Sequence, residues 1–336
     1  MPMKRRWFAP GPVPTEETVS INWSHRSKDF AEIYKTTVTM LEEMTDRKIA
    51  LIQGSASAAI ESVLNGMKLS FRNTGVVIGG DFSIRVANTL NGEGVLKPAF
   101  ASVAAVAEYL RNPIMPQLKA LYMVQFETSH SKFQDTTELS ALCKNKGIPF
   151  IVDAVSAFPY YPIPDADVII LSSSKQLRGL PVLGIVAYKK EIEATLWHHT
   201  GYLSLWSAIQ RGKEGQTPHT TLMPQVLSLY RTLVLEEWVS YVNAIDGNAL
   251  DVTKGLGDYL IGEKIAPVIT IRTKVPETLV GHLKSLGLEP YWNPSYMKDR
   301  IQVSCFNYQE SGPYQELNDV LKDAEKKGWL GDESSM

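Results

Sequence analysis

The chain has 336 residues, and its 34 basic and 36 acidic side chains leave a net charge of −2. This near balance argues against a protein that wraps a polyanion, because affinity for phosphate backbones depends on clustered Lys and Arg. Apolar residues make up 44% of the chain and charged residues 21%, which favours a folded core over disorder. We expect a protein that binds neither nucleic acid nor membrane.

Two further features narrow the class of protein. No apolar run approaches the roughly 20 residues of a membrane-spanning helix, and the start of the chain lacks the apolar stretch of a signal peptide. Cys143 and Cys305 are the only cysteines, too few for a disulfide framework or a metal cluster. The sequence therefore predicts a cytoplasmic α/β protein without a bound metal, and most such proteins of this size are enzymes.

Short β-branched runs alternate with helical patterns over the first two thirds of the chain, which predicts βαβ units and a mostly parallel sheet. The runs are apolar on both faces, as expected when helices cover both sides of the sheet. We expect strands at 48–52, 74–78, 120–125, 149–152, 168–171 and 182–188. We expect helices at 30–45, 58–67, 83–91, 103–110 and 137–146.

The pattern changes after residue 188. A segment rich in Trp, His and Gly leads to one long amphipathic helix over 223–243, and helices at 277–286 and 313–327 alternate with strand-like runs. This order predicts a small α+β domain. We expect a large domain over 15–235, and a small domain formed by 236–336 with the N-terminal arm, 1–14.

Three motifs follow predicted strands. The stretch Gln53-Gly54-Ser55-Ala56-Ser57 opens a helix, where small residues and free N–H groups favour a phosphate, although an ordinary serine N-cap would look the same. Asp153 directly follows an apolar strand, at the sheet edge where α/β proteins bind ligands, or it simply caps a turn. Lys175 follows the next strand, and partial burial there would lower its pKa and make it an imine-forming amine. The alternative for Lys175 is a solvated side chain in a polar loop.

The three motifs together fit one cofactor, pyridoxal 5'-phosphate. A lysine holds it as a Schiff base, an aspartate keeps its ring nitrogen protonated, and a helix start binds its phosphate. The glycine-rich fingerprints of nucleotide-binding turns are absent from the sequence.

With these motifs the sequence resembles the fold-type I pyridoxal-phosphate enzymes of aminotransferase class V. This family includes alanine/serine–glyoxylate aminotransferases and, more distantly, phosphoserine aminotransferases. The resemblance covers nearly the whole chain and rests on the strings FAPGPVP, SHRSKDF, QGSASAAIE, FETSHSKFQDTTEL, PFIVDAVSAF, LSSSKQLRGLPVLGIV, QTPHTT and DRIQVS. It implies a large domain with a mostly parallel sheet flanked by helices, and a small α+β domain.

The resemblance also implies roles for individual residues. Lys175 matches the Schiff-base lysine and Asp153 the partner of the ring nitrogen, and these two are the expected catalytic residues. The other expected cofactor contacts are Val155 and Phe82 on the two ring faces, Thr128 near the ring hydroxyl, and Ser55, Ala56, Ser57 and Ser174 at the phosphate. Thr220 matches a residue that reaches the phosphate from the other subunit, which implies a homodimer.

The expected substrate contacts come from other segments. Arg300 matches the arginine that clamps a substrate carboxylate through a bidentate pair. Gly11, His25 and Arg26 lie in N-terminal motifs that reach the substrate in the family. A His-Arg pair binds the substrate phosphate in phosphoserine aminotransferases, whereas in glyoxylate-type relatives the pair is largely structural.

These motifs predict an aminotransferase that moves an amino group from a small amino acid, of the serine or alanine type, to glyoxylate or pyruvate. The alternatives are a phosphoserine or 2-aminoethylphosphonate aminotransferase, and a lyase or cysteine desulfurase on the same scaffold. A desulfurase needs a mobile loop cysteine, and Cys305 lies instead in a strand-like run.

Overall fold

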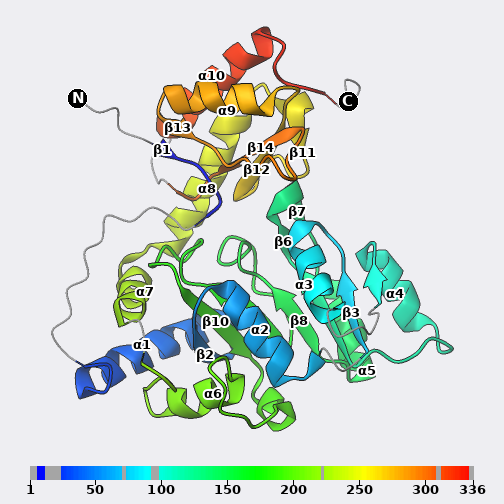
Figure 1. Cartoon of the computed structure of the whole chain (residues 1–336), viewed down its shortest axis with the longest axis vertical. Coiled ribbons are helices and arrows are strands. Elements are labelled where there is room, and N and C mark those ends of the chain that lie inside the picture. Colours follow the sequence, from blue (N-terminus) through cyan, green and yellow to red (C-terminus); the bar gives the residue numbers. More distant parts are fainter. Residues whose placement is uncertain are drawn as a thin grey trace. The chain divides into compact units, whose positions relative to one another are not determined.

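The computed structural model describes residues 6–11, 24–69, 73–91, 98–220, 223–307 and 312–332. The motifs at 8–14 and 216–221 therefore lie partly outside the described residues. The chain divides into two units (Figure 1). The larger unit comprises Thr15–Glu127 and Gln134–Glu236, and the smaller unit comprises Met1–Pro14, Thr128–Phe133 and Glu237–Met336.

A seven-stranded sheet forms the centre of the larger unit, with the order β2-β10-β9-β8-β5-β3-β4. Strand β10 is antiparallel to both β2 and β9, and the other pairs are parallel, so the sheet is mostly parallel as predicted. The strands are β2 Lys48–Gln53, β3 Thr74–Val77, β4 Ala99–Phe100, β5 Ala120–Val124, β8 Phe150–Asp153, β9 Val168–Ser172 and β10 Leu183–Tyr188. The short β6 Phe126–Glu127 follows β5.

Helices flank this sheet (Figure 1). They are α1 Lys28–Thr45, α2 Ala56–Gly66, α3 Asp81–Asn91, α4 Val103–Arg111, α5 Thr137–Lys146, α6 Leu205–Lys213 and α7 Met223–Leu235, with a 3₁₀ helix, η3, at Lys190–Thr195. The central strands are buried along their whole length, which explains their continuous apolar sequences. Apolar faces of α2, α3 and α6 pack into the same core as β2, β5 and β9.

Two features differ from the prediction. Helix α6 lies in the Trp- and His-rich segment, for which no helix is expected. The single helix expected over 223–243 is two helices, because α7 ends at Leu235 and α8 begins at Trp238. At this break the Glu236 carboxylate lies 3.4 Å from the Arg178 guanidinium, and both side chains are largely buried. The ion pair fixes the end of α7 to the turn after β9.

Among its described residues, the smaller unit has a three-stranded antiparallel sheet and three α-helices. The sheet order is β11-β12-β14, and β1 pairs with β13 in parallel. The elements are β1 Arg6–Trp7, η2 Thr128–His130, β7 Lys132–Phe133, α8 Trp238–Thr253, η4 Gly257–Tyr259, β11 Leu260–Ile261, β12 Val268–Arg272, α9 Pro276–Ser285, β13 Leu288–Glu289, β14 Arg300–Ser304 and α10 Gly312–Lys326. No helix among the described residues combines the length and apolarity that a membrane crossing requires.

Candidate active site

Three motif-bearing turns lie at one edge of the large sheet. Strands β8 and β9 end there at Asp153 and Ser172, and β2 ends there at Gln53. Strand β10 begins between β2 and β9, with Leu183 opposite Gln53 and Gly184 opposite Ser172. The register of the sheet therefore brings together motifs that are more than a hundred residues apart in the chain.

The start of α2 approaches this edge closely. Gly54 has φ +129°, and a Cβ added there would lie 2.6 Å from the Cβ of Ala58, so glycine is required. Ser55 is the N-cap residue, but its side chain makes no cap hydrogen bond within the described part of the chain. The Ala58 N–H donates to the Ser55 carbonyl at 2.9 Å, so the groups that can bind an anion here are the Ser55 hydroxyl and the N–H groups that precede Ala58 in the turn.

The turn that carries Lys175 is held by hydrogen bonds on both sides. The N–H of Ser173 donates to the Leu183 carbonyl at 3.1 Å, and its Oγ donates to the Leu180 carbonyl at 2.7 Å. The Gln176 amide donates to the Ser156 carbonyl at 2.6 Å and its oxygen accepts from the Tyr160 N–H at 3.1 Å. These bonds position the half-buried Lys175 at the sheet edge.

Lys175 and Asp153 interact electrostatically. The pKa of Lys175 is lowered to about 8, mainly by burial; the negative charge of Asp153 opposes this shift, and the positive charge of Arg85 adds to it. Burial also raises the pKa of Asp153. Hydrogen bonds from Val155 and Tyr122 lower it, as do the positive charges of Arg85 and Lys175. Lys175 is thus an amine with a lowered pKa, and it interacts with the carboxylate of Asp153, whose neighbours favour the ionised form.

The remaining predicted residues of the larger unit lie in several places. Ser174 is buried, with its Oγ 3.3 Å from that of Ser172. Val155 directly follows the Asp153 turn, and its N–H donates to Asp153 Oδ1 at 3.0 Å. Phe82 opens α3, is 37% exposed, and has the Arg85 guanidinium 5.2 Å from its ring centre.

A second group of predicted residues surrounds the segment 216–220. Arg26 Nη1 donates to Gln216 Oε1 at 2.8 Å and to the Thr217 carbonyl at 3.0 Å. His25 is half-buried beside it, and Thr220 is exposed. Arg26 therefore holds the segment that leads to Thr220, the residue expected to serve the other subunit.

Thr128, Gly11 and Arg300 belong to the smaller unit. Thr128 is buried, and its carbonyl accepts a hydrogen bond from the Gln302 amide. Gly11 has open space where a Cβ would stand. Arg300 begins β14, and its Nε lies 2.7 Å from Asp299 Oδ1.

Three residues of this region have no role in the sequence-based prediction. Tyr122 on β5 donates from its hydroxyl to Asp153 Oδ2 at 3.1 Å. Glu127 accepts from the N–H groups of Phe82 and Ser83. Arg85 acts on Asp153 and Lys175 through its charge. Tyr122 and Glu127 lie in or beside an apolar strand and resemble ordinary core residues until the order of the strands is known.

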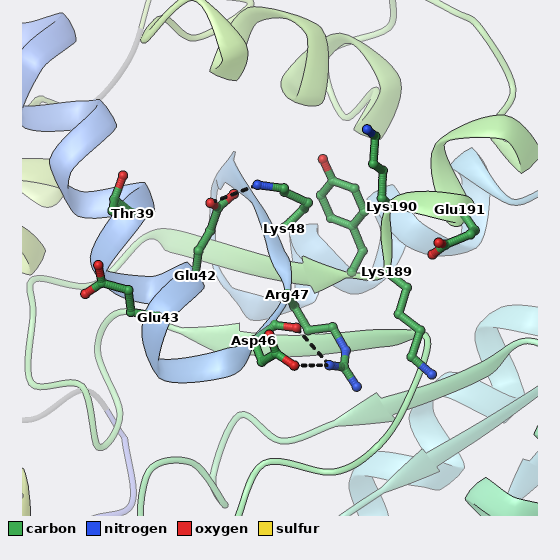
Figure 2. Close-up of a pocket in the computed structure, with 10 residues that line it drawn as sticks. Thr39, Glu42, Glu43, Asp46, Arg47, Lys48, Lys189, Lys190 and Glu191 are labelled. Atoms are coloured by element: carbon green, nitrogen blue, oxygen red, sulfur yellow. Dashed lines mark hydrogen bonds and ion pairs between the residues drawn. The ribbon is translucent and has the colours of Figure 1, made fainter.

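A pocket of about 470 Å³ lies at the opposite end of β2 and β10, where Lys48 is opposite Tyr188. Figure 2 shows charged side chains around it. Lys48 pairs with Glu42 at 3.1 Å, and Arg47 pairs with Asp165 at 2.9 Å. Since these charges neutralise one another at the surface, the pocket is a weaker candidate than the Lys175 edge. Elsewhere too, the described His, Cys, Asp and Glu residues form no group of three that could hold a metal ion.

The sequence has relatives among 2-aminoethylphosphonate–pyruvate transaminases, although no family model matches the chain. The enzyme of Aeromonas hydrophila is 27% identical over 210 residues, which cover 54% of each chain. That of Rhizobium meliloti is 24% identical over 352 aligned positions, covering 92% of this chain and 90% of the relative. For several curated relatives, the chain spans little more than half of their length.

Solved aminotransferase structures share the fold. Ureidoglycine–glyoxylate aminotransferase of Bacillus subtilis superposes with a TM-score of 0.82 at 17% identity, over 98% of this chain and 95% of that one. Alanine–glyoxylate aminotransferase of a Nostoc species gives 0.81 at 16% identity, over 97% and 96%. The chain therefore has the fold of fold-type I pyridoxal-phosphate transferases, as predicted. The resemblance to class V aminotransferases is confirmed in sequence and in fold.

Proposed function

We propose that this chain is a pyridoxal-phosphate-dependent aminotransferase that moves an amino group from a small donor, of the serine or alanine type, to glyoxylate or pyruvate. The observation that carries the proposal is the pairing of Lys175, with its lowered pKa, and buried Asp153 on one sheet edge. Perturbed titratable groups at such an edge are typical of catalytic sites.

The residues at this edge fit the cofactor. Lys175 would hold it as a Schiff base, Asp153 would face its ring nitrogen, and Phe82 and Val155 would cover its ring. The start of α2, with the uncommitted side chain of Ser55, suits the phosphate. When bound, the cofactor supplies an electron sink that stabilises negative charge at the donor's α-carbon.

Side chains of the protein would move the proton and hold the cofactor and the substrate in place. Lys175, which is half neutral at a pH of about 8, would take a proton from the donor's α-carbon and return it to the cofactor. Asp153 would stay ionised and hold the ring nitrogen in its protonated form. Arg300 would orient the carboxylate of the donor and of the 2-oxo acid, which raises the rate through positioning.

A second candidate function is transamination of 2-aminoethylphosphonate with pyruvate. It is favoured by curated relatives such as those of Aeromonas hydrophila and Rhizobium meliloti, which carry that activity in their names. A desulfurase is less well supported, because both thiols are buried. Burial raises the pKa of Cys143 to about 12 and raises that of Cys305 further, so neither would supply a thiolate.

The test begins with the purified chain and added pyridoxal phosphate. We expect a visible absorption band that borohydride removes and that Lys175→Ala lacks. Half-reactions with alanine, serine, phosphoserine and 2-aminoethylphosphonate would then rank the donors. A chain that keeps no absorption band after the excess cofactor is removed would refute the proposal, whereas release of elemental sulfur or alanine from cysteine would favour the lyase.

We also propose that the active unit is a homodimer in which Thr220 serves the partner's cofactor site. Thr220 is exposed and continues a segment fixed by Arg26, as a residue directed at another subunit should be. Mixing Lys175→Ala and Thr220→Ala chains tests this. If Thr220 acts across the dimer, the mixed dimer has one intact site and regains activity. If it acts within its own subunit, both sites remain defective.

A further inference from the structure

Tyr122 and Asp153 are neighbours on one face of the large sheet. Strands β5 and β8 pair in parallel with Tyr122 opposite Ile151, so Tyr122 is diagonal to Asp153 and on the same face. The tyrosine is fully buried, and its hydroxyl donates to Asp153 Oδ2 at 3.1 Å. The sheet itself therefore fixes the geometry of this bond.

The two carboxylate oxygens of Asp153 have separate donors. Oδ1 accepts from the Val155 N–H at 3.0 Å, and Oδ2 accepts from Tyr122. Each oxygen has a further acceptor direction, because a carboxylate oxygen can accept two hydrogen bonds. The two donors prevent rotation of the carboxylate and leave it able to bind a third group.

The charges around the pair support the same arrangement. Burial raises the pKa of Tyr122 well above its ordinary value, and Asp153 and Glu127 raise it further, so the hydroxyl keeps its proton. Burial raises the pKa of Asp153, while the hydrogen bonds and the cations of Arg85 and Lys175 lower it. Tyr122 thus stays protonated and donates a hydrogen bond to Asp153, and this bond favours the ionised carboxylate that burial alone would disfavour.

We propose that Tyr122 is a positioning residue that holds Asp153 ionised and oriented toward the ring nitrogen of the cofactor. This inference rests on the proposed function, since it assigns Asp153 the role of ring partner. Tyr122 itself would touch neither substrate nor cofactor. Its effect would pass entirely through Asp153.

The variant Tyr122→Phe removes the hydroxyl and keeps the ring in the core. Loss of a donor to the charged form raises the pKa of Asp153, so the proton shared with the ring nitrogen moves toward Asp153. We expect kcat to fall several-fold with KM nearly unchanged, because a smaller share of Asp153 stays ionised. The acid limb of the kcat–pH profile should move to higher pH, and the dissociation constant for pyridoxal phosphate should rise several-fold.

The experiment is a double-mutant cycle on cofactor binding, read by visible absorption. Wild type, Tyr122→Phe, Asp153→Asn and the double variant are each titrated with pyridoxal phosphate. If Tyr122 acts through Asp153, Tyr122→Phe weakens binding in the wild type but not in the Asp153→Asn background. The matched control is Tyr34→Phe, which removes a hydroxyl that is equally buried, in α1. Its cofactor affinity and pH profile should equal those of wild type.

The outcomes separate the two proposals. If wild type binds no pyridoxal phosphate, the proposed function fails, and this inference fails with it. If wild type binds and Tyr122→Phe matches it in affinity and pH profile, the role of Tyr122 alone is refuted. An equal loss in the wild-type and Asp153→Asn backgrounds also refutes it, because that result indicates damage to packing.

Discussion

The N–H of Ser83 donates to Glu127 Oε2 at 3.2 Å, so a buried carboxylate at the end of β6 binds the first turn of α3. Glu127 Oε1 accepts from the preceding N–H group of that turn, on Phe82, at 3.0 Å. The carboxylate also lies at the positive end of the helix dipole. These contacts offset the cost of burying the charge and fix the backbone of Phe82, the residue proposed to stack on the cofactor.

Replacement of Glu127 by Gln should therefore loosen the start of α3. The amide keeps the shape but is neutral and offers one acceptor oxygen, so both N–H groups lose a charged partner and one of them loses its acceptor. We expect the free energy of unfolding of the apo-protein to fall by about 2 kcal/mol, measured by urea denaturation, and cofactor affinity to fall as well. The control is Glu138→Gln on α5, where the glutamate is exposed and pairs with Arg111. Equal stability of Glu127→Gln and wild type would contradict this interpretation.

The pKa of Lys175 leads to a prediction about pH. A lysine reacts with an aldehyde as the neutral amine, which is the major form above the pKa. The rate at which the apo-protein captures pyridoxal phosphate should therefore rise with pH and level off above a midpoint of about 8. Stopped-flow absorption across the pH range measures this midpoint. A midpoint near that of free lysine would show that Lys175 is solvated.

Arg85 should contribute to that midpoint. Its positive charge disfavours the ammonium form of Lys175, so Arg85→Gln should raise the pKa and move the capture midpoint to higher pH. The matched control is Arg111→Gln on α4, which removes an exposed arginine paired with Glu138. That variant should keep the wild-type midpoint. If both variants shift the midpoint equally, the effect comes from net charge and not from the position of Arg85.

Ser55 and Ser27 form a natural comparison between two helix starts. Ser27 caps α1, since its Oγ accepts from the Phe30 N–H at 3.2 Å, whereas Ser55 makes no such bond at α2 within the described residues. Ser27→Ala should therefore lower the free energy of unfolding by about 1 kcal/mol and leave cofactor affinity unchanged. Ser55→Ala should instead weaken the binding of pyridoxal phosphate and leave the free energy of unfolding of the apo-protein unchanged. A stability loss in Ser55→Ala would mean that its hydroxyl is only a cap.

Much of the large sheet could be predicted from the sequence, because its buried strands are short apolar runs separated by helical patterns. The position of Asp153 and Lys175 at the sheet edge could be predicted for the same reason, since a polar residue at the end of such a run, or in the turn after it, lies at that edge. The antiparallel direction of β10 and the order of the strands could not be predicted. They depend on which strands pair, and the apolar runs are nearly alike.

The break between α7 and α8 could not be predicted either. The sequence around it, with neither Gly nor Pro from Leu233 to Tyr241, continues the helical pattern. The helix ends where Glu236 meets Arg178, which is distant in the chain. Tyr122 is a similar case: it lies within an apolar run and becomes a partner of Asp153 only through the register of β5 and β8.

Arg26 offers a test of the donor. Its guanidinium already donates to Gln216 and to the Thr217 carbonyl, so we expect it to support that segment and not to bind a substrate anion. Arg26→Ala should then lower kcat/KM for alanine and for 2-aminoethylphosphonate by the same factor. Gln216→Ala, which removes one of the two acceptors, should give a smaller loss that is also equal for both donors. A loss confined to the phosphonate would instead place Arg26 at the substrate, and would favour 2-aminoethylphosphonate as the natural donor.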